Sequence, residues 1–193
     1  MRVDFLTSEQ IASAANVILL LDCQDKTEQE IDVIGICQQH FGLSIHFVDL
    51  KSAYGENTLG MMLSNEKLIL CDLSIEPFGE RKEHKERILR FTIAHELGHH
   101  IFHQGYLDCE TSPTFYNDLG DKEKDRIELQ ANIFASMLLM PEKLFRNMYQ
   151  MLQTQDLKKS NLIKRLADMF NVSKEAAGYR VHAIEKEVVK EEA

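Results

Sequence analysis

The stretch that decides the fold is Ile88–His103, which reads ILRFTIAHELGHHIFH. Its aliphatic residues recur every fourth position, the spacing that places them on one face of an α-helix. This apolar stripe consists of Leu89, Ile93, Leu97 and Ile101. His95 and His99 are also four residues apart, and both project from a different face. The stretch therefore predicts a helix that is buried on one side and carries two histidines on the other.

Residues 95–99 form the pattern H-E-x-x-H. Two imidazoles one turn apart can share a tetrahedral zinc ion, and the neighbouring Glu96 can act as a general base. Gly98 costs about 1 kcal/mol relative to alanine in a helix, so we expect a strand or substrate backbone to approach closely there. His103 rises about 12 Å from His95, too far for both to bind one ion. A third ligand must come from another helix.

Residues 122–139 have the period of a second helix, which Pro141 ends. Its apolar stripe consists of Ile127, Ala131, Phe134 and Leu138. Glu128 and Asn132 project from another face. On spacing alone, Glu128 is equally well a solvated surface residue or the third ligand of a His, His, Glu site. The Asn132 amide is placed to accept a hydrogen bond from a liganding histidine and hold its tautomer.

The residues before this region predict two helices followed by a small antiparallel sheet. Each helix opens with a capping box, formed by Thr7 with Gln10 and by Thr27 with Glu30. Residues 43–48 alternate apolar and polar side chains, and residues 61–71 have the pattern of two strands around a polar turn. The strand at residues 67–71 is either an exposed edge that pairs with an extended substrate or an ordinary interior strand.

Composition excludes several classes of protein. The 193 residues are 44% apolar and carry a net charge of −9, which argues against wholesale binding to nucleic acid or anionic lipid. The four cysteines form no C-x-x-C pair, and no segment has the length of a membrane span. We therefore expect a cytoplasmic domain over residues 1–193. Within it we expect a catalytic core over 1–141, a helical subdomain over 142–184 and a charged tail over 185–193.

Residues 158–182 resemble a helix-turn-helix, with Ser173 placed to cap the second helix. This segment has six basic and two acidic residues, so it is locally basic within an acidic chain. Such corners are common packing units, and only Lys174 and Arg180 stand out as contacts for DNA. We therefore expect docking of a protein partner here in preference to direct DNA binding.

Three runs of sequence closely resemble the ImmA/IrrE family of metallopeptidases. They are RFTIAHELGH at 90–99, ELQANIFA at 128–135 and LLMP at 138–141. The resemblance implies a zincin-like α+β peptidase that binds one Zn²⁺ per chain. It also implies that His95, His99 and Glu128 are the ligands and that Glu96 is the catalytic base.

The resemblance further implies limited proteolysis of a helix-turn-helix repressor of a mobile element, a prophage or a stress response. An alternative is a regulator that binds DNA or a repressor, as an anti-repressor or in a toxin-antitoxin system, with a non-catalytic zinc site. The residue that stabilises the oxyanion stays open among Tyr106, Tyr116, His100 and His103. Residues 104–120 are either a lid over the site or an inert connection. We expect a monomer.

Overall fold

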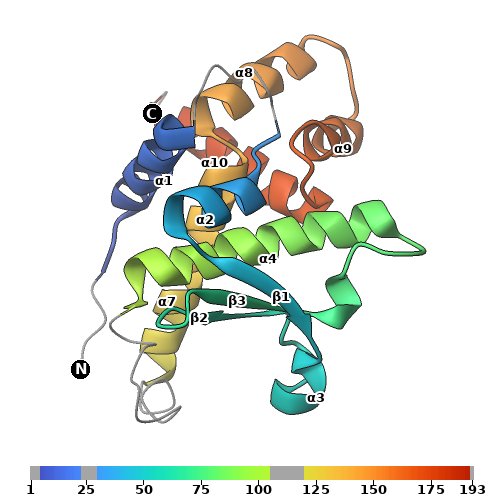
Figure 1. Ribbon diagram of the computed structural model, residues 1–193. Helices are drawn as coiled ribbons and strands as arrows, with labels where there is room; N and C mark the ends of the chain where they lie inside the picture. The colour runs from blue at the N-terminus through green and yellow to red at the C-terminus, as the bar shows by residue number, and fades with distance from the viewer. Residues whose placement is uncertain (1–4, 23–29, 105–119, 192–193) are drawn as a thin grey trace.

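The computed structural model describes residues 5–22, 30–104 and 120–191, with side chains up to residue 186. Its architecture is α+β and mostly helical (Figure 1). The helices are α1 (Ser8–Asp22), α2 (Val33–Phe41), α3 (Leu50–Tyr54), the short 3₁₀ helix η1 (Leu73–Ile75), α4 (Lys82–Phe102), α7 (Asp121–Leu139), α8 (Glu142–Gln153), α9 (Lys159–Met169) and α10 (Lys174–Glu191). The strands are β1 (Ser44–Val48), β2 (Gly60–Leu63) and β3 (Leu68–Asp72).

The first two helices begin with different caps. The capping box of α1 is confirmed, since the Thr7 amide donates to Gln10 Oε1 at 2.9 Å and the Gln10 amide donates to Thr7 Oγ1 at 3.3 Å. Thr27 lies outside the described residues, and Glu30 lies in a bend before α2. The predicted start at Thr27 is therefore wrong. Asp32 instead caps α2 by accepting from the Gly35 amide.

The described residues form a three-stranded sheet in the order β1-β3-β2. The hairpin of β2 and β3 is antiparallel as predicted, but β1 pairs with β3 in parallel, so the predicted antiparallel sheet is in fact mixed. Alternation of apolar residues does not distinguish the two pairings. The long connection through α3 and β2 is what lets β3 return beside β1 in the same direction. The strand predicted at residues 67–71 is therefore central, and β2 lies at an edge.

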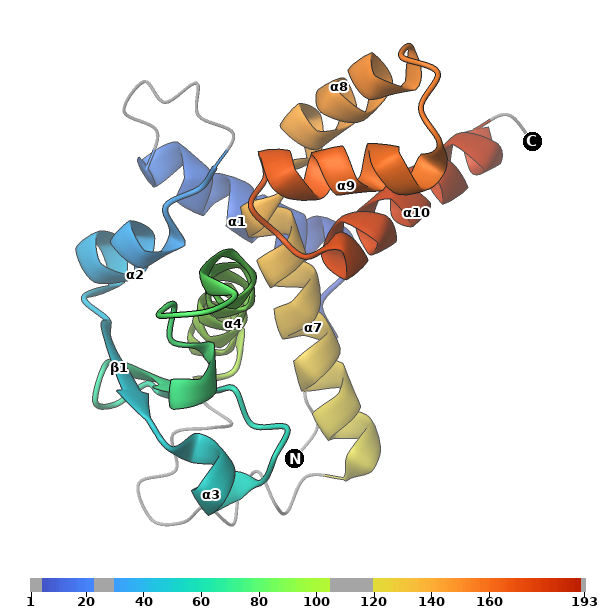
Figure 2. The same ribbon diagram turned by 90° about the vertical axis from the view of Figure 1, so that its right-hand side faces the viewer.

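Helix α4 lies across one face of the sheet and packs most extensively against α7 (Figures 1 and 2). Its apolar stripe is buried except for Ile101, which is half-buried, and Glu96 and His99 are buried as well. A Cβ atom at Gly98 would lie 3.2 Å from the Ala131 Cα atom and 3.0 Å from the Phe134 ring. The predicted close approach therefore exists. However, helix α7 makes it, not a strand or a substrate.

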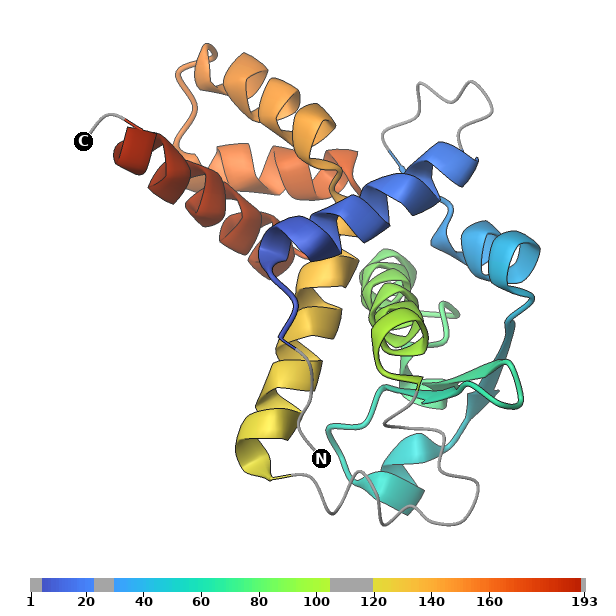
Figure 3. The same cartoon turned by 90° about the vertical axis from the view of Figure 1, so that its left-hand side faces the viewer.

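The C-terminal helices α8, α9 and α10 gather on the side of α4 opposite the sheet (Figures 2 and 3). The turn between α9 and α10 packs through apolar side chains, among them Phe170 and Val172, both 0% exposed. The Ser173 Oγ atom accepts from the Ala176 amide at 3.1 Å, as the sequence predicts for the cap of α10. Helix α10 continues through Glu191, into the segment predicted as a tail. None of the described helices has the length and hydropathy that a membrane span requires.

Candidate metal centre

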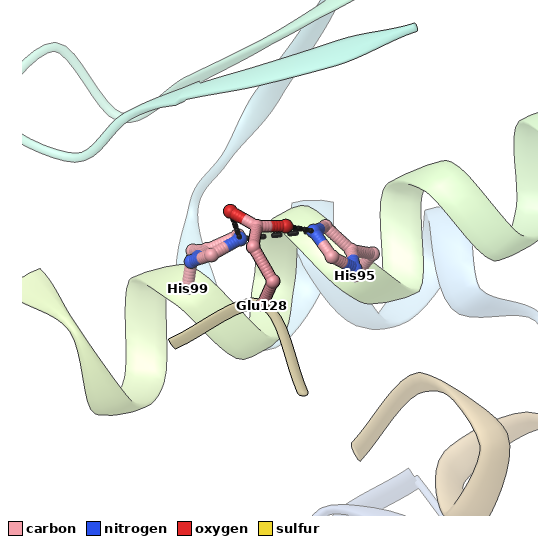
Figure 4. A group of neighbouring side chains, drawn as sticks. All are labelled: His95, His99 and Glu128. Atoms are coloured by element: carbon pink, nitrogen blue, oxygen red, sulfur yellow. Dashed lines mark hydrogen bonds and ion pairs between the residues drawn. The ribbon is translucent and has the colours of Figure 1, made fainter. Parts of the chain in front are cut away.

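Three side chains from α4 and α7 converge on one point (Figure 4). The Nε2 atoms of His95 and His99 are 2.9 Å apart. The Glu128 carboxylate reaches across from α7, with Oε2 at 3.2 Å from His95 Nε2 and Oε1 at 3.6 Å from His99 Nε2. The potential ligand atoms all lie within 4.8 Å of one another, so the group could hold a metal ion.

The electrostatics of this group follow from its burial and its hydrogen bonds. Burial alone would raise the pKa of Glu128, but hydrogen bonds with His95 and His99 outweigh it and hold that pKa well below its usual range. Burial alone would lower the pKa of His95, whereas the Glu128 carboxylate and neighbouring Glu96 raise it above its ordinary value. The Glu128 carboxylate therefore stays ionised and favours the charged form of His95.

Glu96 lies beside this group under strand β2. It is 7% exposed, and this burial raises its pKa despite a backbone hydrogen bond from Met62 of β2. At Gly60, a Cβ atom would lie 2.5 Å from Glu96 Oε1 and 2.5 Å from Thr92 Cγ2. The strand can therefore pass this close to the carboxylate only because residue 60 has no side chain. Sequence reasoning missed Gly60 and Met62, since no local pattern links a strand to a glutamate that lies 36 residues after Gly60.

Asn132 lies next to His95, one turn along α7 from Glu128. Its Oδ1 atom is 3.1 Å from His95 Nδ1. An amide oxygen only accepts, so His95 Nδ1 carries a proton, and Nε2 is the ring nitrogen that faces Glu128 and His99. The structure thus brings Asn132 to the ring nitrogen of His95 that does not face the centre, and its effect on metal binding stays a prediction.

His103 and Gln130 form a second hydrogen-bonded arrangement on the other side of His99. The Nδ1 atoms of His99 and His103 are 3.1 Å apart, and His103 Nε2 lies 2.9 Å from Gln130 Oε1. Burial lowers the pKa of His103 to about 4. Both ring nitrogens have protein partners, which leaves neither free for a substrate. Sequence reasoning missed Gln130, although a polar residue one turn before Phe134 on the apolar face was a signal of a buried hydrogen bond.

The remaining candidates for substrate contacts are less closely tied to the centre. His100 Nδ1 lies 3.1 Å from Ser64 Oγ in the turn between β2 and β3, and its ring meets Phe41 edge-on. Tyr106 and Tyr116 lie outside the described residues, as does nearly all of the predicted lid. The residue that stabilises an oxyanion therefore stays open.

Residues 80–182 match the IrrE N-terminal-like domain of the peptidase M78 family. The match spans more than half of the 193 residues and includes α4, α7 and all three converging side chains. The chain belongs to this family. The predicted resemblance to this family is thereby confirmed.

Structural comparison supports the fold of this M78 family member. It resembles a Mycobacterium tuberculosis transcriptional regulator with a TM-score of 0.58 and 16% sequence identity. The similarity covers 89% of this chain but only 46% of the regulator, so the M78 chain spans about half of that protein's length. No curated protein matches the chain. At this identity the comparison establishes a shared fold.

Proposed function

We propose that the protein is a zinc-dependent endopeptidase that cuts a regulatory protein at a limited site. The observation that carries this proposal is the convergence of His95, His99 and Glu128 with the buried Glu96 beside them. Two imidazoles and a carboxylate are a donor set that catalytic zinc sites use, with a fourth position left for water or substrate. The family membership adds peptide bonds as the substrate class.

The donor atoms present fit a single zinc ion per chain. Asn132 holds the Nδ1 proton of His95, which leaves Nε2 to bind the ion, and the ionised Glu128 supplies an anionic oxygen. We propose that His95 and His99 bind through Nε2 and that Glu128 binds through its carboxylate. A zinc ion held by these three residues would supply Lewis-acid chemistry, lowering the pKa of a bound water and polarising a peptide carbonyl.

Glu96 then performs the proton transfers of hydrolysis. Its carboxylate takes one proton from the attacking water as the new bond forms between the water oxygen and the carbonyl carbon. When the C–N bond breaks, Glu96 returns that proton to the leaving nitrogen. The backbone hydrogen bond from Met62 and the contact with Gly60 hold the carboxylate beside the two histidines. Strand β2 therefore positions the base.

Strand β2 also offers a place for an extended substrate. In the described part of the chain it pairs with β3 on one side only, and it passes directly over Glu96. A substrate segment added to this edge would form main-chain hydrogen bonds with little dependence on its side chains. Such pairing brings a peptide bond close to Glu96 without a deep specificity pocket.

We propose a helix-turn-helix repressor as the substrate, on the basis of the family resemblance. The C-terminal subdomain, residues 142–184, then serves to dock it. Arg180, one of two candidate DNA contacts in this corner, is 8% exposed, and Lys159 forms an ion pair with Glu185 at 2.7 Å. These positions favour a packing and protein-docking role over DNA binding. The protein would act as a cytoplasmic monomer.

Metal analysis and one substitution test the proposal. We expect about one zinc per chain after gentle purification, and cleavage of a repressor encoded next to this gene that stops on chelation. Glu96→Gln should keep the zinc and lose cleavage by at least about 100-fold. Glu83→Gln, at an exposed position in the first turn of α4, is the matched control and should cleave normally.

Two results would contradict the peptidase proposal. A protein that neither contains nor takes up a divalent metal cannot use this mechanism. If Glu96→Gln still relieves repression in cells, the protein acts by binding its partner, and the alternative of a non-catalytic regulator is correct. Salt-sensitive binding to duplex DNA at submicromolar concentration would instead support a DNA-binding regulator.

A further inference from the structure

Behind His99, a line of hydrogen bonds leads from the metal centre into the protein interior. His99 Nδ1 meets His103 Nδ1 at 3.1 Å, and His103 Nε2 meets Gln130 Oε1 at 2.9 Å. His103 is 1% exposed and Gln130 is 3% exposed, so water does not compete for these contacts. His103 extends from α4 and Gln130 from α7, the two helices that carry the converging side chains.

The acceptor at the end of this line of hydrogen bonds, Gln130 Oε1, determines which nitrogen donates in each of them. The Gln130 oxygen only accepts, so His103 Nε2 carries a proton. A neutral imidazole with its proton on Nε2 presents a lone pair at Nδ1, which here accepts from His99 Nδ1. His99 then carries a proton on Nδ1, which leaves Nε2, the nitrogen that faces Glu128 and His95, to bind a metal. A metal ligand through Nε2 requires this arrangement.

We propose that His103 and Gln130 are positioning residues that hold His99 in its ligand tautomer and ring orientation. This inference rests on the proposed metal site and assigns His103 a role other than contact with substrate. His95 receives the same support from a single amide, Asn132, which is exposed. The His99 relay is buried and has two members, so it also links α4 to α7 at the metal centre. Such partners of liganding histidines govern metal affinity.

The tautomer of His99 can be measured directly in the full chain without metal. Long-range ¹H–¹⁵N NMR correlations of the histidine rings distinguish Nδ1–H from Nε2–H. We expect Nδ1–H for His99 in the wild-type protein and a mixture of tautomers in His103→Leu and Gln130→Leu. His103→Asn keeps an acceptor at the position of Nδ1, so it should restore the Nδ1–H form.

Zinc affinity provides a second readout, measured by competition with a chromophoric chelator. His103→Leu and Gln130→Leu should weaken zinc binding about 10-fold to 100-fold, and His103→Asn should stay within a few-fold of wild type. Ser64→Ala is the matched control. It removes a buried partner from His100 on the same helix, leaves His99 untouched, and should leave zinc affinity unchanged.

Two outcomes would overturn the relay. One is a His99 ring that carries Nε2–H and no Nδ1–H in the wild-type protein, because His99 would then not donate to His103. The other is an unchanged His99 tautomer and zinc affinity in both leucine variants. If wild-type protein takes up no zinc, the proposed peptidase function fails, whereas the NMR measurement still decides the relay. The two failures are therefore distinguishable.

Discussion

The metal-centre half and the C-terminal corner of the molecule bury different kinds of side chain. The centre buries Glu96, His99, His103 and Gln130, and each has a polar partner. The corner between α9 and α10 buries mainly apolar residues and leaves Lys164 and Lys174 exposed. Burying polar groups costs free energy unless they are paired, and pairing fixes their orientation. The difference indicates that orientation matters at the centre and packing matters at the corner.

The two regions are nevertheless joined through the first half of α4. Arg87 forms an ion pair with Asp168 of α9 at 2.8 Å, and Arg90 donates to the Asn171 carbonyl at 3.3 Å. Glu30 also belongs to this junction. Its carboxylate forms an ion pair with Arg90 and accepts a hydrogen bond from the side-chain amide of Asn171. The following predictions test whether the centre and the corner behave as separate units despite this junction.

Metal removal should have the largest effect and should act on the centre alone. Chelation should abolish cleavage and lower the unfolding midpoint. The reason is that an ion bound only by the native state stabilises it by about 4 kcal/mol at a concentration 1,000 times its Kd. Calorimetry with zinc and with chelator measures this shift. Glu128→Ala should remove it, and an equal midpoint under both conditions would contradict a native metal site.

Phe170→Ala should destabilise the corner and leave zinc binding at the centre unchanged. The ring is fully buried and packs against Phe145 with ring centroids 5.2 Å apart, so its loss leaves a cavity and should cost about 3–5 kcal/mol of unfolding free energy. Denaturant titration measures this cost. Zinc affinity of the folded variant should stay unchanged. A fall in zinc affinity as large as that expected for His103→Leu would show that packing at the corner affects the metal centre.

Two glycine substitutions compare the regions directly. Gly60→Ala should reduce cleavage about 100-fold with zinc retained, because its Cβ atom would displace Glu96 and a shift of about 1 Å in a catalytic group has this effect. In Gly178→Ala of α10, the nearest atom to the new Cβ belongs to Ile163 at 3.9 Å, an ordinary contact. This variant should keep its zinc affinity and gain up to about 1 kcal/mol of stability. Cleavage by Gly60→Ala at the wild-type rate would contradict positioning by β2.

Asp72→Asn should have the smallest effect, and that effect should depend on pH. Asp72 accepts from the Leu50, Lys51 and Ser74 amides at 2.9, 3.1 and 2.8 Å. Burial alone would raise its pKa, but these hydrogen bonds lower it below the ordinary value. The carboxylate therefore stabilises the fold above about pH 4, and this contribution disappears as the pH falls further.

We expect Asp72→Asn to lose about 1–3 kcal/mol at pH 7 and much less near pH 3. Denaturant titrations of both proteins at the two pH values measure the difference. A loss that does not change with pH would mean that the amide oxygen, and not the charge, supports these turns. Zinc affinity should not change, since Asp72 contacts none of the converging side chains.

Local sequence patterns predicted most of the helices and the pair of histidines, because a helix places residues three and four apart on one face regardless of its surroundings. They also predicted the β2–β3 hairpin and the caps at Thr7 and Ser173. They could not predict that β1 runs parallel to β3, since the alternation of side chains is the same in both directions. The predicted start of α2 at Thr27 is wrong because Asp32, five residues later, caps the helix instead.

The sequence by itself determined the composition of the site. It contains an H-E-x-x-H helix, a second helix with Glu128 and Asn132, and the motifs of a peptidase family. Only the tertiary structure decided how these parts support one another. It placed Gly60 of β2 against Glu96 and Gln130 of α7 against His103, and it buried Arg180 in the corner. Each of these contacts joins separate elements, and their meeting depends on packing of the whole chain.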